Sequence, residues 1–358
     1  MALSIAIVGL PNVGKSTLFN ALTDAGALAA NYPFATIEPN TGIVPVPDER
    51  LIVLQNMYSA EKVIPATVTF VDIAGLVAGA SQGEGLGNQF LANIRECDAI
   101  VHVVRAFLGD DILRHGDAAI DPRSDIDIIN TELILADIQT IDKHLPKLQK
   151  EAKADPAKRA EVEQLTQLRA ELDSGDFPKS KIQNLQSTLQ LLTAKPVIYV
   201  FNVDEAGLTD ETLQSQMKSL VTPANTVFVC AKLEEELRGL NEADAAELLS
   251  SYGVAESSLA QLARAAYHTL GLQSYLTAGP KEVRAWTVHT GATAPEAAGV
   301  IHTDFERGFI AAQIVSYPDL IDAGSEANAQ KLGKLRTVGR DYVMQPDDVV
   351  EFRFNVKK

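Results

Sequence analysis

Short apolar runs followed by polar or glycine-rich residues recur through the first two thirds of the chain and predict buried strands. These runs cover residues 3–8, 66–73, 99–104, 196–201 and 226–230. Residues 17–22, which follow the first run, have the pattern of a helix. Strands that alternate with helices in this way predict an α/β fold with a doubly wound, mostly parallel sheet.

Apolar residues recur at steps of three and four from about residue 125 onwards, which is helical spacing. The positions are Ile134, Ile138, Ile141, Leu145 and Leu148, then Val162, Leu165, Leu168 and Leu172, then Ile182, Leu185, Leu189 and Leu192. These narrow seams between charged residues predict a helical coiled-coil arm over residues 125–195, with a hairpin packed on the core as the alternative. We expect Pro146 to kink or break the first helix, and residues 174–178 to form a turn.

The end of the chain has the pattern of a smaller domain. Residues 283–288 and 349–354 alternate between apolar and polar positions as strands do. Between them, Thr293 is placed to cap a helix that has Pro295 in its first turn. The sequence therefore predicts an α/β domain at 1–124 and 196–277, the arm at 125–195, and a C-terminal domain at 278–358.

Composition and charge narrow the classes of function. The 358 residues carry a net charge of −16, which argues against non-specific binding of nucleic acid through overall charge. Cys97 and Cys230 adjoin apolar runs and are expected to be buried thiols. We see no signal peptide and no apolar run long enough to span a membrane. We therefore expect a cytoplasmic monomer with no membrane partner and no DNA sequence specificity.

A basic cluster in the C-terminal domain could meet rRNA phosphates. It consists of Lys331, Lys334, Arg336 and Arg340. A solvated charged surface is the alternative, since residues 281–358 contain ten Lys and Arg against eleven Asp and Glu. The C-terminal domain is thus less acidic than the rest of the chain, although it is not basic overall.

Residues 9–16, with the sequence G-L-P-N-V-G-K-S, match the phosphate-binding loop G-x-x-x-x-G-K-[ST]. The loop lies between a predicted strand and a predicted helix, which is the context that this motif requires. Main-chain N–H groups at the helix N-terminus would bind phosphates, Lys15 would reach the β- and γ-phosphates, and Ser16 would bind Mg²⁺. We expect nucleotide contacts from Asn12, Val13, Gly14, Lys15, Ser16 and Thr17.

Two further segments have the positions of the nucleotide-sensing loops of P-loop switch proteins. Thr36 follows the first helix and is our candidate for a contact to Mg²⁺, with an ordinary surface threonine as the alternative. Asp72 begins the sequence D-x-x-G, so its carboxylate would bind the Mg²⁺ shell and the Gly75 N–H would sense the γ-phosphate. Leu76 stands where Ras-like enzymes have the glutamine that orients the attacking water, and leucine cannot do this.

Hydrolysis therefore needs another group to position water, or it is intrinsically slow. His115 lies in a polar loop after the run at 99–104 and could act as a base or hydrogen-bond partner. An exposed histidine without a role is the alternative. His102, inside that run, is more typical of a core histidine with satisfied hydrogen bonds.

The fourth apolar run ends at the sequence N-V-D-E, where GTP-binding proteins have N-K-x-D. There the Asp accepts two hydrogen bonds from guanine and the Lys packs along the base. Here Val203 replaces the Lys, and Glu205 places the carboxylate one methylene further out. Asn202 can still meet adenine N7 and N6. Together with Cys230 and Ala231 in the loop that closes over the base, this pattern predicts that ATP binds at least as tightly as GTP.

The P-loop, the sequence D-I-A-G-L at 72–76 and the glycine-rich run at 83–90 resemble the Obg-related P-loop proteins. Residues 286–299 and 301–306 resemble a TGS domain, a small ubiquitin-like β-grasp fold. With the N-V-D-E sequence, the whole chain is identified as a member of the Obg-like ATPases, the YchF family. The resemblance implies an Obg-type G domain, Mg²⁺ as cofactor, and an ATPase that associates with ribosomes. Asn12 also resembles a loop asparagine that binds K⁺ in some related enzymes.

Three functions remain open. The first is an ATP-hydrolysing switch on the ribosome, with the large subunit and rRNA as the expected partners. The second is an ordinary Obg-type GTPase, which the N-V-D-E sequence argues against. The third is a binding module in which nucleotide occupancy matters and turnover is incidental, because Leu76 predicts slow hydrolysis.

Overall fold

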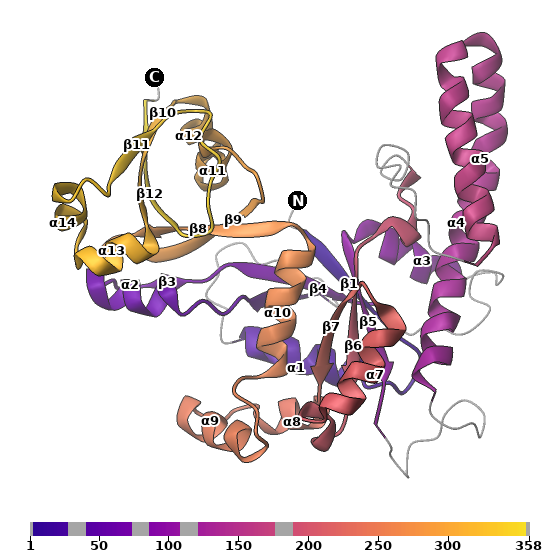
Figure 1. Ribbon diagram of the computed structural model, residues 1–358, viewed down its shortest axis with the longest axis horizontal. Coiled ribbons are helices and arrows are strands. Elements are labelled where there is room, and N and C mark those ends of the chain that lie inside the picture. Colours follow the sequence, from indigo (N-terminus) through magenta and orange to yellow (C-terminus); the bar gives the residue numbers. More distant parts are fainter. Residues whose placement is uncertain (1–2, 28–40, 74–85, 108–120, 176–188, 356–358) are drawn as a thin grey trace. The chain divides into compact units, whose positions relative to one another are not determined.

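The computed structural model describes residues 3–27, 41–73, 86–107, 121–175 and 189–355, and Figure 1 shows its ribbon. The chain forms two compact units. Unit 1 comprises Met1–Ile43 and Thr69–Leu262, and unit 2 comprises Val44–Val68 and Ala263–Lys358. No helix among the described residues is long and apolar enough to cross a membrane.

The sheet of unit 1 has six strands in the order β2-β4-β1-β5-β6-β7. Its strands are β1 (Ser4–Val8), β2 (Thr41–Pro45), β4 (Thr67–Asp72), β5 (Ala99–Arg105), β6 (Val197–Asn202) and β7 (Asn225–Val229). The pairs β1–β4, β1–β5, β5–β6 and β6–β7 are all parallel. This confirms the predicted α/β class, and five of the six strands form where the apolar runs placed them, whereas β2 was not predicted.

The helices of this part of the chain connect the strands or follow them. They are α1 (Lys15–Ala27), α3 (Leu86–Glu96), α4 (Pro122–Ala154), α5 (Arg159–Asp173), α7 (Glu211–Val221), α8 (Ala231–Glu236), α9 (Glu242–Ser251) and α10 (Ser258–Thr269). Short 3₁₀ turns occur at Pro156–Lys158, Leu192–Ala194 and Ala206–Leu208.

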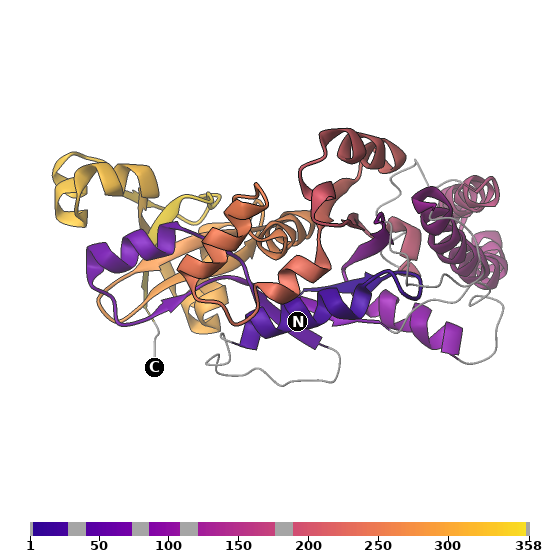
Figure 2. The ribbon, with the colours of Figure 1, turned by 90° about the horizontal axis from the view of Figure 1, so that it is seen from below.

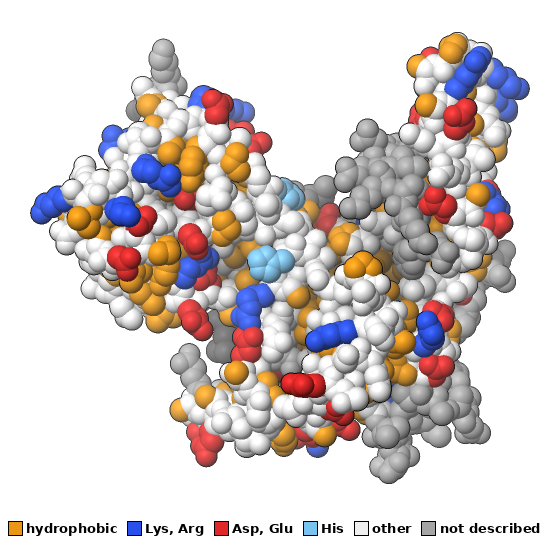
Figure 3. Space-filling model, viewed as in Figure 1, with side chains coloured by type: hydrophobic (Ala, Val, Ile, Leu, Met, Phe, Trp, Pro, Cys, Tyr) orange, Lys and Arg blue, Asp and Glu red, His pale blue; other side chains and the backbone are white. Residues whose placement is uncertain are grey.

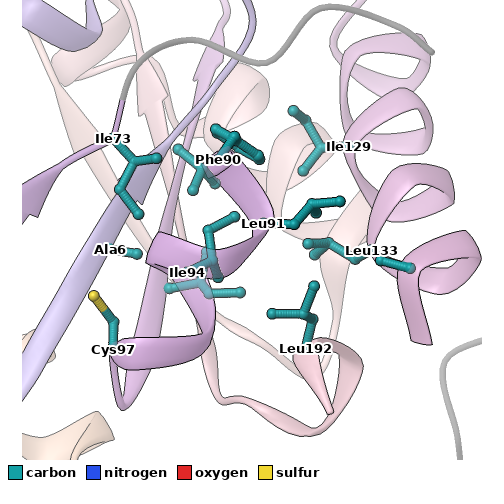
Figure 4. Close-up of a cluster of buried hydrophobic side chains, with 12 residues drawn as sticks. Ala6, Ile73, Phe90, Leu91, Ile94, Cys97, Ile129, Leu133 and Leu192 are labelled. Carbon is teal, nitrogen blue, oxygen red and sulfur yellow. The ribbon is translucent and has the colours of Figure 1, made fainter. Parts of the chain in front are cut away.

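One face of the sheet is covered by α3, the first turns of α4, and α7. In Figure 4, Phe90, Leu91 and Ile94 of α3 lie between Ala6 of β1 and the side chains of α4. Leu192, from the turn before β6, closes the same cluster. Burial of so many aliphatic side chains is the main stabilisation of the sheet, at about 25 cal/mol per Å² of apolar surface.

Helices α4 and α5 form a hairpin and lie side by side in both ribbon views (Figures 1 and 2). Most of the apolar seam predicted from the sequence is its core, which includes Ile134, Ile138, Ile141, Leu145, Leu148, Val162, Leu165, Leu168, Leu172 and Leu189. Leu192 packs with α3 and the first sheet instead, and Ile182 and Leu185 lie outside the described residues. Helix α4 continues through Pro146, so the predicted break does not occur there. Because Pro146 is exposed, water can bond the main-chain oxygen that proline leaves without its helical partner.

A buried carboxylate joins α4 to the segment that enters β6. The Asp137 carboxylate is fully buried and accepts hydrogen bonds from the Leu192 and Thr193 N–H groups and from the Thr193 hydroxyl, over 2.7 to 2.9 Å. Burial raises the pKa of Asp137. Its polar contacts satisfy main-chain groups that would otherwise be buried without partners.

The sheet of unit 2 has six strands in the order β11-β10-β12-β8-β9-β3. Strand β8 (Leu272–Ala278) is antiparallel to β9 (Val283–His289) and parallel to β12 (Asp348–Phe354), while β10 (Phe309–Ser316) is antiparallel to β12 and to β11 (Arg336–Val338). Helix α11 (Ala294–Ile301) packs on this sheet. The remaining elements are α2 (Arg50–Tyr58), β3 (Val63–Ile64), α12 (Thr303–Arg307), α13 (Tyr317–Ala323) and α14 (Glu326–Lys331).

The start of α11 follows the sequence prediction. Pro295 lies in the first turn, and the Glu296 carboxylate accepts hydrogen bonds from the Thr293 N–H over 2.6 Å and from its hydroxyl over 2.8 Å. The bond from the Thr293 N–H is one half of a capping box, and the contact of the Thr293 side chain with the Glu296 main chain is the other half. The bond from the Thr293 N–H also lowers the pKa of Glu296.

The boundaries of the units differ from the predicted ones in two places. Strand β8 was placed in the α/β domain, yet it pairs with β9 and β12 in the sheet of unit 2. Residues 44–68 also belong to unit 2, where β3 pairs with β9 and Arg50 forms a 2.9 Å ion pair with Asp347. The pairings of β3 with β9 and of β8 with β12 leave no local sequence signal, because those partners are far apart in the chain.

Candidate nucleotide-binding site

The phosphate-binding loop connects the carboxyl end of β1 to the N-terminus of α1. Asn12 and Gly14 have left-handed backbone conformations, with φ of 64° and 89°, and the Leu18 N–H donates to the Gly14 oxygen over 2.9 Å. This geometry turns the loop and starts the helix. Free N–H groups of the first helical turn can then bind phosphate oxygens.

Gly14 is required for a second reason, which is its contact with Asn202. A Cβ atom at residue 14 would lie 2.3 Å from Asn202 Nδ2. Asn202, at the end of β6, donates through Nδ2 to the Val13 oxygen over 2.9 Å and accepts through Oδ1 from the Ala231 N–H over 3.2 Å. Asn202 therefore ties the phosphate loop to the start of α8.

This arrangement gives Asn202 a positioning role that the sequence did not predict. We expected its amide to meet adenine N7 and N6, but its oxygen and one of its donors are engaged with the main chain. The side chain is 5% exposed. Asn202 therefore positions two loops of the pocket, and the contact of its remaining Nδ2 hydrogen with the base stays a prediction.

Lys15 and Asp72 meet at the carboxyl ends of β1 and β4. The Lys15 ammonium forms an ion pair and hydrogen bond with Asp72 Oδ1. Both groups are largely buried, with side-chain exposures of 10% and 19%. A buried cation next to a carboxylate, at the end of a phosphate loop, is a site where an anionic ligand and a divalent cation can replace the direct pair.

A pocket of about 460 Å³ opens beside the phosphate loop. Its lining combines the loop with the ends of β5, β6 and β7: Asn12, Gly14, Thr17, Phe107, Asn202, Val203, Asp204, Glu205, Cys230, Ala231, Lys232 and Glu235. These elements all end at the carboxyl edge of the parallel sheet, where open α/β sheets bind ligands. Seven of these twelve lining residues were predicted to contact nucleotide, and the other five, Phe107, Asp204, Glu205, Lys232 and Glu235, were not predicted to do so. Phe107 could have been inferred only from its place just beyond β5.

Two substituted positions of the N-V-D-E sequence face different surroundings. Val203 is 2% exposed, and its side chain packs with Tyr199 and Phe201 in the core. Glu205 Oε1 accepts a 2.8 Å hydrogen bond from Lys232, which lowers the pKa of Glu205. Glu205 occupies the motif position of the aspartate that reads guanine in GTP-binding proteins, and here its carboxylate has Lys232 as its partner.

The remaining predicted residues lie at different depths or outside the described ranges. Thr36, Gly75 and His115 lie outside them, as does Leu76. His102 is buried as predicted, but its Nε2 has no hydrogen-bond partner among the described residues. Burial lowers the pKa of His102 to about 3, so it is neutral at pH 7. Cys97 and Cys230 are buried free thiols, and burial raises the pKa of both.

The phosphate loop, the parallel sheet and the pocket at its carboxyl edge define a P-loop nucleotide-binding protein. Residues 4–132 match a family model described as 50S ribosome-binding GTPase. Residues 272–355 match a model for the C-terminal part of YchF GTPases, described as a protein of unknown function.

Full-length relatives agree with this class. The chain is 50% identical to the ribosome-binding ATPase YchF of Haemophilus influenzae and 48% identical to that of Bacillus subtilis, each over 99% of this chain and 100% of the relative. The structure of the Schizosaccharomyces pombe YchF GTPase superposes with a TM-score of 0.87 at 38% identity, over 98% of this chain and 97% of that one. This chain belongs to the YchF family.

Proposed function

We propose that this protein is an ATPase that binds ribosomes under the control of its nucleotide state. The observation that carries the proposal is the complete phosphate loop beside a pocket of about 460 Å³, in a chain whose curated relatives are named ribosome-binding ATPases along their full length. On this proposal the protein acts in the cytoplasm, as a monomer, on the large ribosomal subunit and its rRNA.

The loop and Lys15 would bind the triphosphate. Main-chain N–H groups from Gly14 to Thr17 point along the start of α1, where the helix dipole favours anions. When a triphosphate enters, Lys15 exchanges its carboxylate partner Asp72 for the β- and γ-phosphates. The ammonium is already positioned and largely desolvated, so this exchange needs little rearrangement.

Ser16 and Asp72 have the oxygen donors that Mg²⁺ prefers, and both lie next to Lys15 at the loop. They would hold the cation, together with Thr36. Bound there, Mg²⁺ would neutralise charge on the β- and γ-phosphates. We extend the same proposal to K⁺ at Asn12, whose left-handed backbone turns the loop at that point.

The base would lie in the pocket between Asn202 and the start of α8. The Glu205 carboxylate is held by Lys232, so a guanine base would have to displace that lysine to gain two hydrogen bonds. Adenine needs no carboxylate, and one placed near its N1 acceptor would repel it. We therefore propose that ATP binds at least as tightly as GTP.

Hydrolysis would proceed with Gly75 at the γ-phosphate and with His115 as the candidate that positions water. Replacing His115 by alanine should leave ATP affinity unchanged and lower kcat at least tenfold. An unchanged kcat would remove His115 from the mechanism.

We also propose that unit 2 is a TGS-type β-grasp domain, since β8 pairs in parallel with β12 and α11 covers their sheet.

GTP hydrolysis is the second candidate, because one relative is described as a GTPase and the matched N-terminal model is described as a ribosome-binding GTPase. Calorimetric titration of the purified protein with ATP and with GTP, at one Mg²⁺ concentration, separates the two. Tenfold tighter binding of GTP would refute the ATPase proposal.

The ribosome is tested by co-sedimentation with ATP, with ADP and with a non-hydrolysable ATP analogue. A switch should give different bound fractions with ATP analogue and ADP. Equal bound fractions in all three states would refute nucleotide control. A bound fraction that depends on occupancy, but is the same with ATP and its analogue over many turnovers, would favour a binding module in which hydrolysis is incidental.

A further inference from the structure

A stripe of lysines runs along the outer half of α4 and has no counterpart on α5. We define the lysine stripe as Lys143, Lys147, Lys150 and Lys153, all exposed. Residues 143–159 contain six Lys and Arg against two Asp and Glu, a net charge of +4 in a chain of net charge −16. Figure 3 shows basic side chains gathered at the far end of the hairpin.

The helical geometry places these four side chains on one face. At about 100° per residue they fall within about 120° of one another, and they extend over about 15 Å of helix axis. Ile141 and Leu148, which are buried against α5, lie on the opposite side of α4. The stripe therefore faces away from the hairpin core.

No stripe lysine forms an ion pair within 4.0 Å among the described residues, although Lys147 contributes to lowering the pKa of Glu151. The ion pairs of the hairpin use other cations, because Lys158 pairs with Glu151 over 2.5 Å and Arg169 pairs with Asp142 over 3.1 Å. Consecutive stripe lysines are three or four residues apart, so each neighbouring pair destabilises the helix by about 0.2–0.5 kcal/mol. A polyanion bound along the stripe would relieve this repulsion.

The basic cluster predicted in the C-terminal domain differs from the lysine stripe because some of its cations have partners within the protein. Lys334 pairs with Asp319 over 3.0 Å, and Arg340 donates to the Phe309 oxygen over 3.3 Å. Two of its four cations thus have partners within unit 2. The stripe on α4 is the better candidate for a contact with external phosphates.

We propose that the lysine stripe of α4 binds the phosphate backbone of RNA without reading its sequence. This inference rests on the proposed ribosome binding, and it names the surface and the partner chemistry. Lysines at one-turn spacing present point charges to successive phosphates, and residues 143–153 contain no arginine, phenylalanine, tyrosine or tryptophan. A membrane surface fits less well, because residues 122–173 contain no aromatic residue that could enter lipid.

The test replaces all four stripe lysines by glutamine in the full-length protein and measures salt dependence. Binding is measured to intact ribosomes and to rRNA extracted from them. The slope of log K against log salt is negative, and each lost phosphate contact should reduce its magnitude by about 0.7–0.9. For four lysines the magnitude should fall by about three in total. The corresponding Lys→Arg variant should bind like the wild type. Circular dichroism and ATP affinity should be unchanged in both variants, because all four positions are exposed and far along α4 from the phosphate loop.

A matched control neutralises the four C-terminal cations, Lys331, Lys334, Arg336 and Arg340, with glutamine. An equal fall in slope for this control would overturn the assignment to α4, as would an unchanged slope for the stripe variant on rRNA. A smaller slope on ribosomes with an unchanged slope on extracted rRNA would identify an acidic ribosomal protein as the partner. That result would overturn the proposal that the stripe binds RNA. If the wild type bound extracted rRNA through the stripe but did not sediment with ribosomes, the inference would stand and the proposed function would fail.

Discussion

Replacing Asn202 by alanine should weaken the binding of ATP and GTP by the same factor. The side chain contacts the main chain of two loops, at the Val13 oxygen over 2.9 Å and at the Ala231 N–H over 3.2 Å. A residue that positions both loops affects the phosphate site and the base site together. A residue that reads the base would instead change the ratio of the two affinities.

The magnitude follows from the two groups that would lose their partner. The Asn202 side chain is 5% exposed, and each buried polar group left unsatisfied costs about 1–3 kcal/mol. Alanine would therefore destabilise the native loop arrangement by about 2–6 kcal/mol, less where water fills the vacated space. If 2 kcal/mol of this falls on the conformation that binds nucleotide, both affinities drop about thirtyfold.

Calorimetry with non-hydrolysable ATP and GTP analogues measures both affinities, and urea unfolding measures stability. Asn241→Ala is a matched control, because Asn241 is exposed and caps α9 by accepting from the Asp244 N–H over 3.0 Å. It should cost about 1 kcal/mol of stability and leave both affinities unchanged. A tenfold change in the ATP-to-GTP ratio for Asn202→Ala would show that Asn202 reads the base, and would refute the positioning role.

Three further predictions concern single residues. Lys15→Ala should abolish ATP hydrolysis and strongly weaken triphosphate binding, whereas the exposed Lys218→Ala should do neither; turnover at the wild-type rate would exclude the assigned site. His102 has its pKa lowered from 6.5 to about 3 by burial, so the unfolded chain takes up its proton first and stability falls as pH drops below 6.5. The loss should reach about 2 kcal/mol at pH 5 in urea unfolding, and the corresponding contribution should be absent in His102→Leu. Asp137→Ala removes the acceptor of two buried N–H groups and should destabilise the protein by about 2–5 kcal/mol. A loss of stability below 0.5 kcal/mol in thermal unfolding would contradict the role given to the Asp137 hydrogen bonds.

Local patterns in the sequence determined much of the fold. Apolar runs gave the strands of the first sheet because a strand buried on both faces must be apolar throughout. Steps of three and four gave the seam between α4 and α5, from Ile134 to Leu172, because helix geometry brings those positions to one face. The phosphate loop and the helix cap at Thr293 could also be predicted from the sequence, since each depends on a few neighbouring residues.

Tertiary structure alone decided where distant residues meet. The sequence could not show that residues 44–68 join unit 2, because β3 pairs with β9 and Arg50 with Asp347 across more than 200 residues. From the sequence, the Asn202 amide was expected to contact adenine N7 and N6. In the folded protein the amide bonds to the main chain of Val13 and Ala231, which are distant in the sequence. A run of lysines also looks the same in sequence whether its charges are paired or free. Only the arrangement of carboxylates in space distinguishes Lys334, which Asp319 neutralises, from the stripe of α4, because pairing depends on distances that no local pattern records.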